Sequence, residues 1–98
     1  MLFKTEFQFR DPSEEGTKQL LAVFAAWKPP AGMDIKGFYS YSDGSGGFNI
    51  AEVPDAATML RAVSPFTPWL DFNTVPIVSV EEGTAIGAEA IAFRDGVS

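Results

Sequence analysis

The chain contains no histidine and no cysteine. Without histidine, the commonest general base and the commonest metal ligand of proteins are missing. Without cysteine there is neither a thiol nucleophile nor a disulfide framework, which fits a reducing cytoplasm. No serine stands beside a candidate base, and no Asp-x-Asp loop is present for Mg²⁺ or Ca²⁺. We therefore expect no metal and no cofactor, and the sequence alone leaves open whether the protein is an enzyme.

Basic residues are few, with 7 Lys and Arg against 13 Asp and Glu, so the net charge is −6. A nucleic-acid partner needs a basic stripe that displaces counterions, and an anionic membrane surface attracts the same residues. No apolar run approaches the roughly 20 residues of a membrane span. No secretory signal precedes the first strand pattern. These features predict a small acidic cytoplasmic protein that binds neither nucleic acid nor membranes.

Hydrophobic periodicity divides the 98 residues, which we interpret as one domain (1–98), into four strands and three helices. Asp11-Pro12-Ser13-Glu14 resembles a helix start with an aspartate cap, and Asp55 resembles a second cap. Pro65 and Pro68 interrupt the second helix, so 66–70 is either its kinked extension or a separate turn, and we favour the extension. The expected strands are 2–9, 35–42, 48–53 and 74–80, and the expected helices are 11–27, 55–70 and 81–94.

The order strand, helix, strand, strand, helix, strand, helix predicts an α+β, ferredoxin-like βαββαβ domain with an extra C-terminal helix. Its four-stranded antiparallel sheet takes the order fourth, first, third, second, with the two main helices on one face. The glycine-rich segment 43–47 supplies the positive φ angles of a hairpin. Pairing of Tyr41 with Phe48 then places Gly37 opposite Glu52.

One face of this sheet carries a mixture of charged, aromatic and aliphatic side chains. Side chains along the first strand point alternately to the two faces of the sheet. The face toward the helices receives Phe3, Thr5, Phe7 and Phe9, and the other face receives Lys4, Glu6 and Gln8. We call this second face the open face. The other strands contribute to it Tyr39, Tyr41, Phe48, Ile50, Glu52, Val75 and Ile77. Such a face on a small sheet usually meets a partner or a ligand. We therefore predict a homodimer packed sheet to sheet, of the dimeric α/β barrel type.

The open face also holds the candidate site residues. Glu6 and Glu52 lie on neighbouring strands, where burial and mutual repulsion of the carboxylates favour the neutral form of one and create a general base. A salt bridge from Lys4 is the structural alternative. Tyr39 and Tyr41 offer hydroxyls that orient an apolar, oxygenated ligand, or else pack in the dimer interface.

Two tryptophans complete the set of candidate ligand-binding residues. Trp27 and Trp69 both end helical segments, and each is close to a proline. Either they cover the core beneath the helix ends, or they enclose a pocket between them. The segment 43–47 is excluded as a phosphate cradle because a strand follows it, whereas a cradle needs the N-terminus of a helix.

Short motifs along the chain resemble one bacterial family. They are Met1-Leu2-Phe3, Trp27-x-x-Pro30-x-Gly32, Gly37-Phe38-Tyr39, Gly47-Phe48-x-Ile50-x-Glu52 and the passage from Trp69 to Pro76-Ile77. In these the chain resembles the small bacterial proteins grouped as domain of unknown function 3303, over the whole length to the fourth strand. The resemblance implies a ferredoxin-like fold of the dimeric α/β barrel group. It implies no activity.

Three functions remain open at this point. The leading interpretation is an uncharacterised small homodimer that binds a small apolar ligand in the barrel interior. The second is a cofactor-independent monooxygenase or isomerase with Glu52 or Glu6 as the base and Tyr39 or Tyr41 as an orienting donor. The third is a non-catalytic dimerisation or interaction module.

Overall fold

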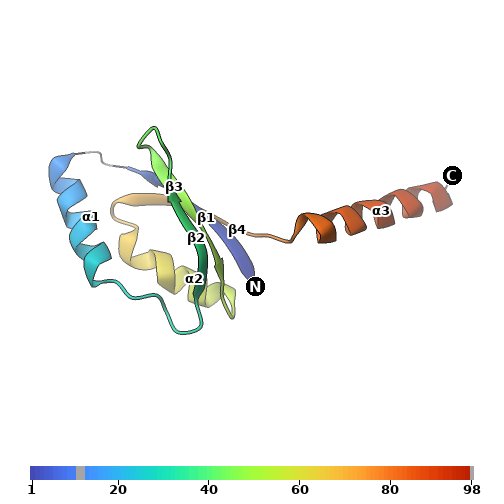
Figure 1. Cartoon of the computed structure of the whole chain (residues 1–98), viewed down its shortest axis with the longest axis horizontal. Helices are drawn as coiled ribbons and strands as arrows, with labels where there is room; N and C mark the ends of the chain where they lie inside the picture. The colour runs from blue at the N-terminus through green and yellow to red at the C-terminus, as the bar shows by residue number, and fades with distance from the viewer. Residues whose placement is uncertain (11–12, 98) are drawn as a thin grey trace.

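A computed structural model describes residues 1–10 and 13–97 of the chain. The described part has the order of strands and helices that the periodicity predicts (Figure 1). In chain order the elements are β1 (Leu2–Phe9), α1 (Glu14–Ala26), β2 (Asp34–Ser40), β3 (Gly46–Glu52), α2 (Ala56–Val63), the 3₁₀ turn η1 (Ser64–Phe66), β4 (Leu70–Pro76) and α3 (Val80–Val97).

The four strands form one antiparallel sheet in the order β2-β3-β1-β4. This is the order predicted for a ferredoxin-like βαββαβ domain. Phe3 and Thr5 are buried on the face that meets the helices, while Lys4 and Glu6 point to the opposite face. The alternation along β1 therefore identified the two faces of the sheet correctly.

Local capping explains where α1 and α2 begin. The Ser13 hydroxyl accepts a hydrogen bond from the Gly16 N–H (3.1 Å) and caps α1; the predicted cap Asp11 and the following Pro12 lie outside the described residues. The prediction for α2 is confirmed, because the Asp55 carboxylate accepts from the Thr58 N–H (2.8 Å). The hydroxyl and N–H of Thr58 stabilise the carboxylate and hold the pKa of Asp55 below its usual range.

Two apolar clusters hold the helices on the sheet. One joins Phe3 and Val53 to Met59 and Ala62 of α2, and the other joins Leu20 of α1 to Phe66 and Leu70. Burial along β1 decreases toward its end, from Phe3 at 5% exposure to Phe9 at 43%. The apolar residues Met59, Leu60 and Val63 predict the buried stripe of α2, but Leu60 is 65% exposed. Thr58 takes a buried position on that helix instead.

The hairpin between β2 and β3 differs from the expected register by two residues. Phe48 pairs with Tyr39 and not with Tyr41, and Gly37 lies opposite Ile50. Gly46 and Gly47 belong to β3, which displaces the turn toward residues 42–45, and a bulge between Ile35 and Gly37 absorbs one extra residue. A shift of two residues keeps each side chain on its face, so the open face retains its predicted members.

The fourth strand begins earlier than the β-rich composition of 74–80 suggests. The turn η1 follows α2 directly, and β4 starts at Leu70, so the expected helical extension over 66–70 is wrong. Pro65 occupies the first turn of η1, and Pro68 prevents the helix from continuing. Residues 77–79 connect β4 to α3.

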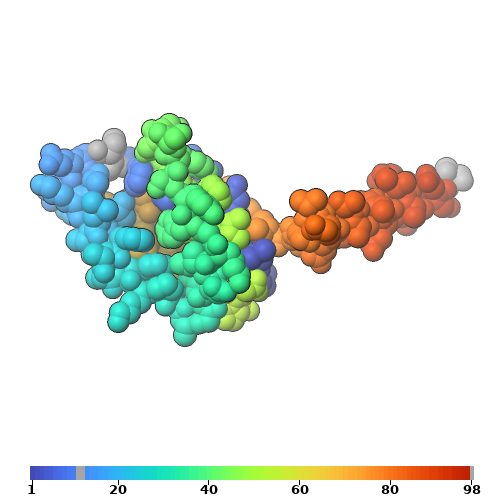
Figure 2. All heavy atoms as spheres, viewed as in Figure 1, coloured from blue at the N-terminus to red at the C-terminus, as the bar shows by residue number. Residues whose placement is uncertain are grey.

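The C-terminal helix α3 projects away from the rest of the molecule (Figures 1 and 2). None of its residues is buried. The molecule accordingly extends over 61 × 31 × 19 Å with a radius of gyration of 17.6 Å, whereas a compact domain of this length has about 13 Å. Within the described residues, no helix has the length and apolar character needed to span a membrane.

Candidate functional site

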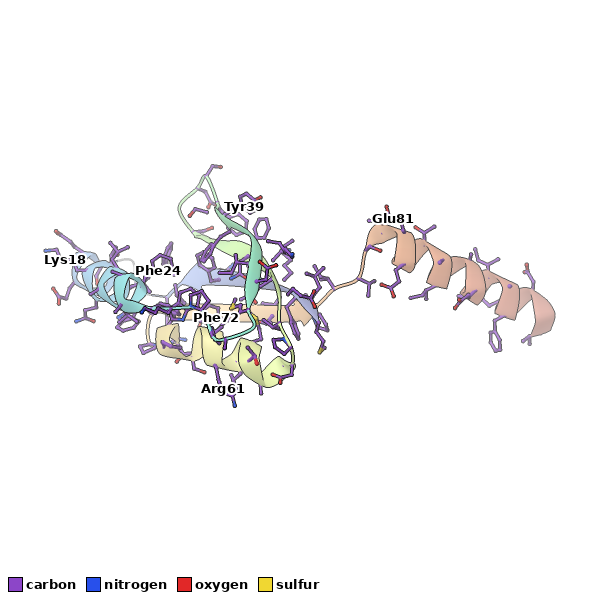
Figure 3. All side chains as sticks on the ribbon, turned by 60° about the horizontal axis from the view of Figure 1, so that its bottom comes forward. Lys18, Phe24, Tyr39, Arg61, Phe72 and Glu81 are labelled. Carbon is purple, nitrogen blue, oxygen red and sulfur yellow. The ribbon has the colours of Figure 1, made fainter. Side chains whose placement is uncertain are left out.

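A pocket of about 220 Å³ lies between the sheet and the helices. Every strand, both α1 and α2, and η1 contribute to its walls. It lies on the helix-facing side of the sheet, opposite the open face. Figure 3 shows Phe24 projecting from α1 toward the sheet, where Phe72 of β4 also borders this region. The fold therefore creates a hollow where the alternation along the strands predicts a filled core.

Aromatic rings form most of the pocket wall. Trp27, which ends α1, packs edge-on against Phe66 with 5.6 Å between ring centroids and stacks with Phe24 at 6.1 Å. Phe38 of β2 contacts both Phe24 (6.0 Å) and Phe7 of β1 (5.9 Å). Aromatic pairs in such arrangements contribute about 0.5–1.5 kcal/mol beyond their buried area, so the rings of the wall stabilise one another.

Two polar side chains interrupt this wall, Asn49 of β3 and Ser40 of β2. Asn49 is 8% exposed, and its Oδ1 atom has no hydrogen-bond partner within the described part of the chain. The Thr5 hydroxyl, on the residue opposite Asn49 in the ladder, shares a hydrogen bond with the Thr74 hydroxyl (3.1 Å) and makes none with Asn49. A buried acceptor without a partner costs about 1–3 kcal/mol, so Asn49 is an unsatisfied polar group in an otherwise apolar wall.

No side chain that lines the pocket carries a titratable acid or base within the described residues. The lining consists of aromatic and aliphatic groups with one amide and one hydroxyl. Such a pocket can hold an apolar molecule and orient it through a hydrogen bond. Proton abstraction by a carboxylate, which the sequence suggested as an alternative, has no group to perform it in this pocket.

The candidate residues from the sequence fall on two sides of the sheet. Trp27 lines the pocket, and Trp69 packs against the adjoining apolar cluster while its indole N–H donates to Gln19 Oε1 (3.2 Å). Glu6, Tyr39, Tyr41 and Glu52 lie on the open face, away from the pocket. The structure thus separates the tryptophans from the other four candidates.

The two glutamates do not form a carboxylate pair. Glu52 lies opposite Leu2 and Glu6 lies opposite Phe48, four ladder positions apart, which corresponds to about 13 Å along the strands. Glu52 is half exposed and its Oε1 accepts from the amino group of Met1 (2.7 Å). This arrangement favours an ion pair at the surface over a desolvated general base.

Glu6 instead pairs with one of the tyrosines. The Tyr41 hydroxyl donates to Glu6 Oε2 (2.5 Å), and both tyrosine rings pack against Phe48, with centroids 5.4 Å away for Tyr39 and 6.0 Å for Tyr41. The Lys4 ammonium lies 5.5 Å from the centroid of the same Phe48 ring. The open face is therefore a connected layer of polar and aromatic groups around Phe48.

We expect Tyr41 to titrate above the ordinary tyrosine range. The hydrogen bond to the Glu6 carboxylate requires the neutral phenol, so ionisation loses that bond and the pKa of Tyr41 is raised. Stability contributed by this bond is present below the usual tyrosine pKa and is lost as the pH rises through the raised value. Carbon NMR of the Tyr41 ring, followed against pH, measures the shift.

The matched variants are Glu6→Gln and Glu52→Gln. The first removes the charge next to the phenol and should return the pKa of Tyr41 toward the ordinary range. The second removes a carboxylate that the structure places far from Tyr41, and should leave its titration unchanged. Equal effects of the two substitutions would show that the hydrogen bond is not the cause.

Asn49 is the site residue that sequence reasoning did not identify. It was placed correctly on the helix-facing side of its strand, together with Phe38, Ser40, Ala51 and Val53. Asparagine is depleted in strands, and a buried polar group among apolar neighbours needs a partner. That anomaly was the available signal, but without the pocket it cannot be separated from an ordinary buried hydrogen bond.

Comparison with solved structures agrees with the class of protein that this fold defines. A crystal structure of muconolactone isomerase, determined at 3.3 Å resolution, aligns over 81% of this chain and 90% of its own, with a TM-score of 0.55 and 14% sequence identity. The chain therefore shares its fold with this isomerase, and the order of elements and strands is the ferredoxin-like arrangement predicted. At this identity the likeness concerns the fold alone.

The family follows from the sequence match. Residues 1–91 match the family described as Domain of unknown function (DUF3303), and the chain belongs to that family. The match extends through β4 into α3 and confirms the resemblance carried by the short motifs. No curated protein matches the chain.

Proposed function

We propose that the protein is a small cytoplasmic homodimer that binds a small, largely apolar molecule in the pocket between its sheet and its helices. The observation that carries this proposal is the buried Asn49 Oδ1 without a partner at the wall of an apolar pocket. The ligand then carries one hydrogen-bond donor, a hydroxyl or N–H, on an apolar body.

The pocket volume bounds the size of the ligand. A cavity of about 150 Å³ accommodates benzene, and this one is about 220 Å³. The space suits one aromatic ring with a short substituent or a compact fused pair of rings. Residues of the aromatic wall, Trp27 and Phe66 among them, then contact the ring faces and edges.

Self-association is supported by the open face. Tyr39 and Val75 are 58% and 41% exposed there, and they flank the half-buried Phe48 and Ile50. Packing this face against a second copy removes these side chains from water and produces the dimeric α/β barrel. In that assembly Glu6, Tyr39, Tyr41 and Glu52 lie in or beside the dimer interface.

The enzymatic alternative is favoured by one observation, the name of the structural neighbour, which is an isomerase. Against it stand the separation of Glu6 from Glu52 and the lining of the pocket, in which we find no titratable group among the described residues. Binding without chemistry is therefore the function that the geometry supports best. A pure interaction module leaves the unpartnered Asn49 without an explanation.

The test compares two ligands of the same shape, 2-naphthol and 2-methylnaphthalene, of which only the first donates a hydrogen bond. We expect the wild-type protein to bind 2-naphthol about 3- to 10-fold more tightly, because a neutral hydrogen bond contributes about 0.5–1.5 kcal/mol. Proton–nitrogen NMR should show shifts at the Asn49 amide and the Trp27 indole on titration.

The variant Asn49→Leu should abolish the preference for 2-naphthol. It should also raise the free energy of unfolding without ligand by about 1–2 kcal/mol, since it replaces a buried unpaired acceptor with an apolar group of similar shape. Asn73→Leu is the control for the ligand preference, because Asn73 lies on the open face and does not line the pocket. Absence of binding by the wild type, or an unchanged preference in Asn49→Leu, would refute the proposed site.

A further inference from the structure

We infer that α3 of one copy packs across the mouth of the pocket of a second copy. The inference rests on the homodimer of the proposed function. It specifies that α3 of each copy contacts the pocket rim of the other. It starts from two exposed apolar surfaces that the chain leaves uncovered: a stripe along α3 and the rim of the pocket.

The stripe on α3 consists of Ile86, Ala90, Phe93 and Val97, spaced by four, three and four residues, so that all lie on one side of the helix. Ile86 is 53% exposed, and Phe93 and Val97 are each 74% exposed. An isolated helix of this length that contains Gly83, Gly87 and Gly96 is marginal in water. Contact with another surface is therefore what stabilises α3.

The rim of the pocket has a matching apolar surface. It consists of Phe9, Leu21, Phe24 and Phe38, which line the pocket and are nevertheless 43–59% exposed. These side chains come from β1, α1 and β2 and surround an opening on the outside of the molecule. A helix laid over the rim would bury them and enclose the ligand site.

The molecule exposes more surface than a compact monomer of the same mass, and the excess is large enough for an interface in which two copies exchange their α3 helices. A compact monomer of 10.6 kDa exposes about 5,500 Å², whereas this chain exposes 6676 Å². The excess of about 1,200 Å² is larger than the roughly 800 Å² that each partner buries in a standard interface. A second copy provides a rim for each stripe, so a two-fold exchange covers both surfaces in both copies.

The geometry disfavours closure by the same chain. The connector 77–79 spans at most about 10 Å, and the Ile77 N–H remains bonded to Leu2 O (2.9 Å). Pro76 lies opposite Phe3, whereas Phe9 of the rim lies about 20 Å further along β1. Phe38 of the rim lies level with Thr5, but on the far edge strand. A helix folded back from the end of β4 must therefore cross the width of its own sheet, three strand spacings or about 14 Å, before it meets Phe38.

Closure by a second copy does not meet this obstacle. The two free edges of the sheet are β2 and β4. When two sheets pack about a two-fold axis parallel to their strands, β4 of one copy lies beside β2 of the other. In that arrangement α3 starts next to the edge strand that carries Phe38 of the second rim.

Cross-linking tests the placement directly, because the chain has no cysteine of its own. The variant Leu21→Cys, labelled with nitrogen-15, is mixed with the unlabelled variant Phe93→Cys, and a short bis-maleimide is added to link nearby thiols. Mass spectrometry then identifies covalent dimers that contain one labelled and one unlabelled chain. We expect this mixed dimer to form, with a several-fold lower yield when Ile91→Cys replaces Phe93→Cys. Equal yields, or linkage only within a chain that carries both Leu21→Cys and Phe93→Cys, would overturn the inference.

The second readout uses two isoleucines of the same helix. Ile86 and Ile91 are 53% and 54% exposed, but only Ile86 belongs to the stripe. Ile86→Ser should weaken binding of 2-naphthol by the full-length protein at least fivefold, and Ile91→Ser should change it less than twofold. Sedimentation at micromolar concentration should give twice the monomer mass for the wild type, and a monomer throughout would contradict the inference.

The two proposals fail separately in these experiments. If the wild type does not bind 2-naphthol, the ligand site is refuted, while the cross-linking yields still decide where α3 lies. If 2-naphthol binds and shifts Asn49 but the mixed dimer does not form, the pocket stands and the exchanged helix is refuted.

Discussion

Phe3→Ala is expected to lower the free energy of unfolding by about 3–5 kcal/mol, the range for removing a buried aromatic ring. Phe3 is 5% exposed and packs with Val53, Met59 and Ala62, so it joins β1 to β3 and to α2. Its loss leaves a cavity between these elements that the rigid strands cannot close. The change is a large part of the 5–15 kcal/mol that stabilises a typical domain, and urea denaturation measures it.

Phe9→Ala is the matched control for this substitution. Phe9 lies on the same strand and the same face, but it is 43% exposed at the mouth of the pocket. We expect its replacement to cost less than about 1 kcal/mol. Similar losses for the two variants would mean that the pocket end of the sheet is as well packed as the α2 end.

Gly47→Ala is expected to cost about 3 kcal/mol, because a methyl group does not fit at this position. A Cβ atom at Gly47 would overlap the carbonyl oxygen of Tyr39 and would lie 2.7 Å from Cζ of Phe7. A backbone carbonyl cannot move aside by a change of rotamer, so the pairing of β2 with β3 must open. Thermal unfolding of the variant should show the loss as a lower midpoint.

Gly44→Ala separates this steric effect from backbone preference. Gly44 has φ +76°, which an alanine adopts at a cost of about 1 kcal/mol, but no atom lies within 4 Å of its added Cβ. The loss at Gly44 should therefore be about a third of that at Gly47. A larger loss at Gly44 would show that the turn, and not the close approach of the strands, limits stability.

The pocket explains why burial along β1 was only partly predictable. Alternation assigns Phe3, Phe7 and Phe9 to one face, and the structure agrees. Alternation does not say how far each ring is from a helix. It predicts that Phe7 lies under the helices against Phe24 or Leu60; Leu60 is 65% exposed, and Phe7 and Phe24 both line the pocket and both contact Phe38. Phe7 instead contributes to the wall of a hollow, so its removal is expected to cost less than removal of Phe3.

The candidate site shows the same limit. The sequence indicated a mixed surface with Glu6, Glu52 and two tyrosines, and these residues do share a face. Whether two carboxylates meet depends on their positions along the ladder, which a strand pattern does not specify. The unpartnered acceptor of Asn49 depends on which donors the surrounding strands and helices bring within reach of it, and among the described residues they bring none.

The sequence by itself determined the order of the elements, the strand order of the sheet, the identity of the two faces and the family, because these follow from local periodicity, capping and short motifs. The tertiary structure alone decided the register of the hairpin, the hollow beneath the helices and the projection of α3. These features depend on distances between segments far apart in the chain. A period of two or of 3.6 residues identifies a face, but it carries no information about how closely that face is covered.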